Sequence, residues 1–132
     1  MESPENSAAH EFVTVTDIEP VALMEGLRAR PVSGERITLA VVELDPGIAM
    51  PEHRHPSEQV GVVVRGEFTF TIGGESRLRK TGDMWVIPAG VPHSVDRAGD
   101  GGCTLVESFS PPRDDWAEKP RTQPSPDRWP PP

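Results

Sequence analysis

The sequence contains no tyrosine, few aromatic residues and a single cysteine, Cys103. One cysteine cannot form a disulfide within the chain, so nothing indicates an oxidising compartment, and we interpret Cys103 as a small apolar strand residue. No apolar run approaches the roughly 20 residues that span a bilayer. No charged and then apolar leader opens the sequence. We therefore expect a soluble cytoplasmic protein with no membrane partner.

Basic residues are also scarce. The chain has 13 lysines and arginines against 21 aspartates and glutamates, which gives a net charge of −8. Nucleic acid repels an acidic protein, and no basic run or basic stripe with aromatic residues offsets this repulsion. The composition therefore argues against nucleic acid as a partner.

Proline is concentrated at one end of the chain, where half of the 16 prolines fall between Pro111 and Pro132. Proline lacks the amide donor that a sheet ladder needs, so residues 116–132 are predicted to form an extended or disordered tail. Residues 1–10 are polar without an apolar period and are predicted to be disordered. Residues 11–115 remain as the single folded domain, a size typical of one domain.

Short β-rich runs alternate with turn signals about every ten residues, a pattern typical of sandwiches and barrels. Val21–Arg28 is expected to enter the fold as a strand. The other predicted strands are Arg36–Leu44, Gln59–Val64, Glu67–Ile72, Glu75–Lys80, Trp85–Ile87, His93–Arg97 and Thr104–Phe109. A largely antiparallel all-β barrel is favoured because closure removes exposed edges. A barrel of about eight strands also leaves room for one small ligand.

Three of the four histidines lie in two short segments. His53 and His55 alternate, so a strand would point both side chains to one face, and His93 follows a turn built from glycine and proline. Imidazole is the commonest nitrogen ligand for borderline metals. Either Glu58 or Gln59 completes the set: a carboxylate is the more usual ligand, whereas strand parity with the two histidines favours Gln59.

These two segments resemble the two sequence motifs of the cupin superfamily. The matching residues are Gly47, His53, His55, Gln59 and Gly66 in the first motif, and Gly82, Pro88, Gly90 and His93 in the second. Gln59 stands where the family usually has glutamate. The resemblance implies a single jelly-roll-like antiparallel β-barrel, of the small single-domain (cupin 2) type. It also implies one divalent transition metal held by His53, His55, Gln59 and His93. Ni, Zn, Mn and Fe(II) all accept such donors, so the metal's identity stays open.

The glutamine has a chemical consequence. Three neutral imidazoles and a neutral amide leave the cation with its full 2+ charge, whereas a carboxylate would cancel part of it. The neutral set favours Lewis-acid chemistry on a hydroxyl or carbonyl oxygen over chemistry with dioxygen.

The segment from His55 to Glu75 and the stretch from Glu107 to Asp114 are similar to pectin-degradation cupins of the KdgF type. That resemblance implies ring opening, an isomerisation, of a 4,5-unsaturated uronate, a small anionic substrate. Phe109 and Arg113 match the family's last strand, whereas Glu107 replaces an aspartate. The implied roles are proton transfer by Glu107, a pair between Arg113 and the substrate carboxylate, and a pocket wall at Phe109. The plainer alternatives are an exposed Glu107 and a solvated Arg113.

Other functions fit the same motifs. A cupin dioxygenase, a polyketide cyclase and a non-catalytic module that binds a small ligand are the alternatives. Arg28 and Arg30 share one face of an early strand, where one of them is a candidate to line the pocket. Val60–Val64 is apolar on both faces. Since such a strand needs a second covering layer, we expect a homodimer.

Overall fold

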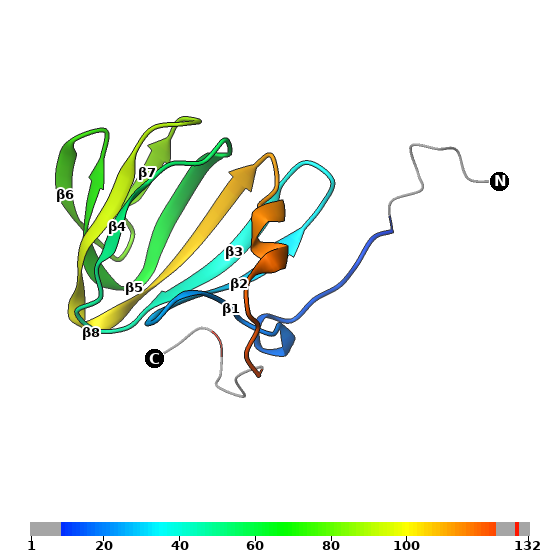
Figure 1. Cartoon of the computed structure of the whole chain (residues 1–132). Helices are drawn as coiled ribbons and strands as arrows, with labels where there is room; N and C mark the ends of the chain where they lie inside the picture. The colour runs from blue at the N-terminus through cyan, green and yellow to red at the C-terminus, as the bar shows by residue number, and fades with distance from the viewer. Residues whose placement is uncertain (1–8, 124–128, 130–132) are drawn as a thin grey trace.

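The computed structural model describes residues 9–123 and Trp129, and their regular structure is almost entirely antiparallel β-strand (Figure 1). The strands are β1 Val21–Met24, β2 Leu27–Ser33, β3 Thr38–Leu44, β4 Met50–His53, β5 Glu58–Ile72, β6 Glu75–Lys80, β7 Met84–Ile87 and β8 His93–Ser110. Two short 3-10 helices, η2 Val15–Asp17 and η3 Asp114–Glu118, flank them. No helix of the described residues is long and apolar enough to cross a membrane. The predicted all-β, jelly-roll-like barrel is confirmed.

The two longest strands, β5 and β8, belong to both halves of the barrel. The sheet runs β1-β2-β3-β8-β5-β6, with β4 paired to β8 and β7 paired to β5. Residues 103–110 of β8 pair with β3 and with the first part of β5, whereas residues 93–98 pair with the last part of β5. β8 bends sharply between these parts (Figure 1). One continuous sheet therefore folds over itself and encloses an interior.

The structure differs from the sequence prediction at these bends. Gln59–Val64 and Glu67–Ile72 were expected as separate strands, as were His93–Arg97 and Thr104–Phe109, but each pair forms one strand with register shifts. The glycines that signal turns instead allow bends within strands. Gly66 has a φ of 81°, and it pairs with Cys103 beside Gly102. Hydrophobic alternation cannot separate such a bend from a hairpin turn, because both interrupt the period.

Alternate side chains of the strands fill the interior. The core includes Val21, Leu27, Ala40, Val42, Val63, Phe68, Phe70, Ile87, Val95 and Leu105. The outer face retains exposed apolar side chains, with Leu39 46% exposed, Val60 42% and Val86 61%. This is the face for which the sequence predicts a second copy of the chain, and the homodimer stays a prediction.

The start of the expected tail packs against the barrel. Trp116 is buried, with its ring centroid 5.2 Å from that of Phe109. Arg121 forms a bridge with Val21 at the edge strand β1. These contacts extend the packing beyond the expected end of the domain at residue 115. Residues 124–128 and 130–132 of the expected tail, and residues 1–8 at the other end, lie outside the described residues.

The bend provides a test with a matched control. A Cβ at Gly66 would lie 2.2 Å from the Gly102 carbonyl oxygen, whereas one at Gly74, which also has a positive φ, would contact nothing within 4 Å. We expect Gly74→Ala to cost about 1–2 kcal/mol from backbone strain alone. Gly66→Ala should cost about 1–3 kcal/mol more because of the overlap. Urea unfolding measures both, and equal losses would contradict the close packing at the bend.

Cys103 lies in β8 and is 1% exposed. Burial raises the pKa of its thiol to about 12, so almost no thiolate forms near neutral pH. We expect iodoacetamide at pH 8 to leave Cys103 unmodified in the folded protein and to alkylate it in urea, as mass spectrometry would show. Rapid alkylation without denaturant would contradict this burial.

Candidate metal centre

Three histidines from three parts of the fold meet inside the barrel. His53 ends β4, His55 lies in the following loop and His93 begins β8, where it pairs in register with His53. One ring nitrogen of each lies within 4.8 Å of those of the other two. The two motif segments, 38 residues or more apart in the sequence, are thus brought together by the pairing of β4 with β8.

Backbone carbonyls orient each imidazole. Nδ1 of His53 lies 3.1 Å from the Pro51 oxygen, and Nδ1 of His93 lies 2.9 Å from the Val91 oxygen. The same contact in His55 is with Ser57, at 2.9 Å. A carbonyl only accepts hydrogen bonds, so each Nδ1 carries the proton and each Nε2 keeps its lone pair. This is the tautomer that a metal ligand needs.

Burial keeps these rings neutral. Desolvation lowers the pKa of His53 and of His55, and the Arg113 charge lowers both further. The pKa of His93 falls to about 4, again mainly through desolvation. Neutral imidazole is the form that binds metal, so the set requires no deprotonation at neutral pH.

Gln59 completes the cluster. Its side chain is buried in β5, whereas that of Glu58 is exposed on the other face of the strand. Gln59 Oε1 lies 3.0 Å from His55 Nε2, and Gln59 Nε2 donates a hydrogen bond to the Glu107 carboxylate. The structure therefore places the glutamine, and not the glutamate, beside the histidines.

The arrangement has a shortage of protons that a cation would satisfy. Both nitrogens of neutral His55 face oxygen acceptors, although only one nitrogen carries hydrogen. His93 Nε2 is buried and has no hydrogen-bond partner. A divalent ion among His53, His55, His93 and Gln59 would pair with these unused lone pairs, so the residues fit the metal that the motifs imply.

Glu107 is buried beside this cluster rather than exposed. It is 6% exposed, and desolvation raises the pKa of its carboxyl to about 7, opposed by the hydrogen bond from Gln59. Glu107 pairs in register with Gly61, which pairs with Trp85 on the other side. A Cβ at Gly61 would lie 2.5 Å from the Trp85 ring and 3.0 Å from the Glu107 side chain, so glycine is needed there.

A cavity of about 340 Å³ contains all the predicted site residues: His53, His55, Gln59, His93, Glu107, Phe109 and Arg113. The Arg113 guanidinium lies 5.0 Å from the Phe109 ring centroid and 4.6 Å from that of Trp116. It also pairs with Asp115 through Nε at 3.0 Å and Nη2 at 2.9 Å. Arg113 is thus held in place rather than solvated.

Sequence reasoning missed Asp115 and Trp116 at this cavity. Both follow the last strand, in a stretch whose prolines suggest a tail, and no periodic pattern indicates that η3 folds back over the opening. A signal was available in the composition, because a tryptophan and an acidic residue close to a predicted binding arginine are candidates for stacking and pairing.

Comparisons with known proteins agree with this geometry. The family model described as "Cupin domain" matches residues 40–109. Pectin degradation protein KdgF of Dickeya dadantii (strain 3937) is 28% identical over 96 residues, which are 71% of this chain and 86% of that protein. The structure of KdgF from Halomonas sp. superposes with a TM-score of 0.73 at 27% identity, covering 81% of this chain and 98% of that one.

A second relative has a different architecture. HTH-type transcriptional regulator PuuR of Escherichia coli (strain K12) is 31% identical over 77 residues. The match covers 56% of this chain and 42% of the regulator, so the chain spans less than half of that relative's length. The similarity concerns a domain and does not extend to the whole regulator.

The fourth histidine provides a control for metal binding. We expect one divalent ion per chain by elemental analysis, with Ni, Zn, Mn and Fe(II) each offered to the protein. His53→Ala should lower the bound metal well below one equivalent by removing a donor. His10→Ala should not, because His10 is exposed and outside the cluster. Equal metal content in wild-type protein and a folded His53→Ala variant would contradict the site.

Proposed function

The chain belongs to the cupin domain family, and from that membership we propose that it is a metal-dependent enzyme that opens the ring of a 4,5-unsaturated uronate. The observation that carries this proposal is the double contact of Gln59. Its carbonyl oxygen faces His55 and its amide donates to Glu107. The metal-ligand set and a buried carboxyl group are therefore one connected unit inside a cavity of substrate size.

The donors define the chemistry that the metal would supply. His53, His55, His93 and Gln59 would hold a divalent ion, which would act as a Lewis acid on a substrate hydroxyl or carbonyl oxygen. All four donors are neutral, so they cancel none of its charge. Such a set supports polarisation without a change of oxidation state.

Glu107 would move the proton. The reaction is an isomerisation: the anomeric hydroxyl loses a proton, the bond between C1 and the ring oxygen breaks, and the resulting enol gains a proton at C4 as it becomes a ketone. A carboxylate at Glu107 accepts the first proton and returns one to carbon. Its burial near the cavity and its pKa of about 7 suit a group that both accepts and donates near neutral pH.

Arg113 would bind the uronate carboxylate. Its guanidinium is stacked between two aromatic rings, so little further ordering is needed on binding. Asp115 now occupies two of its donors. A substrate carboxylate would share the guanidinium or replace Asp115, and Phe109 would form a wall of the pocket.

The similarity to the KdgF proteins supports this substrate, since one of them is described as a pectin degradation protein and the chain covers most of its length. The similarity to the regulator PuuR favours a second candidate, a non-catalytic domain that binds a small ligand in the same cavity. A dioxygenase or a polyketide cyclase is a further alternative, and the neutral ligand set argues against the former.

The test supplies 4,5-unsaturated galacturonate to metal-loaded protein and follows the loss of conjugated ultraviolet absorbance. We expect turnover by wild-type protein, equal in the absence of dioxygen. Glu107→Gln should lower kcat by about 10²–10⁴-fold with its metal retained. Glu58→Gln is the matched control, because that carboxylate is exposed on the other face of β5.

Two results would count against the proposal. No turnover by protein with confirmed metal content would remove the uronate assignment while leaving the metal centre in place. Equal rates for Glu107→Gln and wild type would remove Glu107 from the chemistry.

A further inference from the structure

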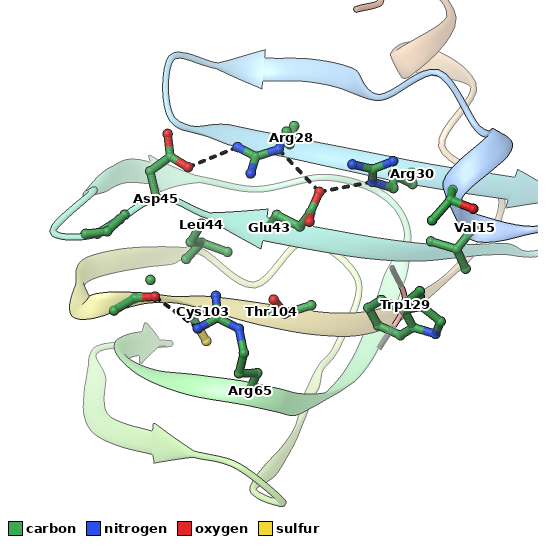
Figure 2. A pocket seen from close by; sticks show the side chains of 14 residues that line it. Val15, Arg28, Arg30, Glu43, Leu44, Asp45, Arg65, Cys103, Thr104 and Trp129 are labelled. Carbon is green, nitrogen blue, oxygen red and sulfur yellow. Dashed lines mark hydrogen bonds and ion pairs between the residues drawn. The ribbon is translucent and has the colours of Figure 1, made fainter. Parts of the chain in front are cut away.

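A second cavity, of about 520 Å³, lies on the outer face of the sheet (Figure 2). Arg28 and Arg30 line it, so neither arginine lines the metal cavity as one of them was expected to do. The physical reason is strand alternation: Leu27 and Ala29 of β2 point into the core, which turns the two arginines outward. The cavity shares only Leu44 with the metal cavity.

Polar side chains cross this face as a row. Arg28 of β2, Glu43 of β3, Thr104 of β8 and Arg65 of β5 lie opposite one another in register. Arg30 stands two residues along β2 from Arg28, and Figure 2 shows all five around the same hollow. Directly opposed residues of neighbouring strands interact, so the row is built by the sheet and not by a flexible loop.

The guanidinium groups have more donors than partners. A single oxygen, Glu43 Oε1, accepts from both Arg28 Nε at 3.2 Å and Arg30 Nε at 3.0 Å. Arg30 is 7% exposed, and its Nη1 is buried with no hydrogen-bond partner. Arg65 donates to the Gly101 carbonyl, but its Nε is buried and also unpartnered. Buried donors in folded proteins are nearly always paired, so these two call for an acceptor.

The local charge has the opposite sign to that of the whole protein. Three arginines line the cavity against two carboxylates, Glu43 and Asp45, which leaves a net charge of +1 there. The chain as a whole carries −8. An acidic protein that gathers arginines in one hollow, with one of them almost fully buried, has a site suited to an anion.

We propose that this cavity binds a small oxyanion, a phosphate or a carboxylate, through Arg30 and Arg65, with Arg28 adding charge. The oxyanion accepts from Arg30 Nη1 and Arg65 Nε, the two donors that the protein leaves unpaired. Arg28 stays paired with Glu43 and Asp45, which keeps the row in place. Trp129 and Val15 lie at one end of the hollow and provide an apolar surface for the rest of the ligand (Figure 2). This site is independent of the proposed uronate chemistry.

The experiment titrates the full chain with inorganic phosphate, and separately with acetate, by isothermal titration calorimetry at constant ionic strength. We expect one site per chain. Arg30→Gln and Arg65→Gln should each weaken binding at least about ten-fold, since each removes a charge-assisted hydrogen bond. Tighter binding of phosphate assigns a phosphate ligand, tighter binding of acetate assigns a carboxylate, and both results support the site.

The controls separate this site from other places where an anion would bind. Arg77→Gln removes an exposed arginine that pairs with Glu75 away from the cavity, and it should leave binding unchanged. His53→Ala should also leave binding unchanged. Arg65 is less buried than Arg30, so Arg65→Gln keeps the test valid if Arg30→Gln does not fold, as circular dichroism would show. Absence of binding by wild-type protein, or binding lost in His53→Ala but kept in Arg65→Gln, would overturn the proposal.

Discussion

The close approach of two backbones at the bend of β5 and β8 is the constraint on which the rest of the structure depends. Gly66 and Gly102 meet there without side chains, and a Cβ at Gly66 would overlap the facing carbonyl. Because both strands bend at this point, each serves both halves of the barrel. Gln59 and Glu107 therefore come from one half and His93 from the other, and all three reach the same interior.

Desolvation shapes the chemistry of that interior. Burial lowers the pKa of His93 and raises that of Glu107, so both groups favour their neutral forms in the absence of a partner. Backbone carbonyls fix the tautomers of the histidines, and the Gln59 amide links the ligands to Glu107. The interior is therefore arranged for one cation and one mobile proton, whereas the permanent positive charges lie at the opening and on the outer face.

Much of the site could be predicted from the sequence because it depends on local spacing. The alternation of His53 and His55, and its extension to Gln59, follows from strand geometry, and the exposed side chain of Glu58 agrees with that parity. The bends at Gly66 and Gly102 could not be predicted, since a glycine signals a turn and a bend equally well. The outward direction of Arg30 and the pairing of Asp115 with Arg113 depend on which strands and loops meet, which local patterns do not encode.

The central claim is that the ion is held by three imidazoles and the amide oxygen of Gln59, with Glu107 left free beside it. A crystal structure of metal-loaded protein with anomalous scattering from the metal tests this most directly. The account predicts one anomalous peak about 2.0–2.2 Å from three histidine nitrogens and from Gln59 Oε1. A peak coordinated by the Glu107 carboxylate in place of Gln59, or a peak outside the histidine cluster, would contradict it.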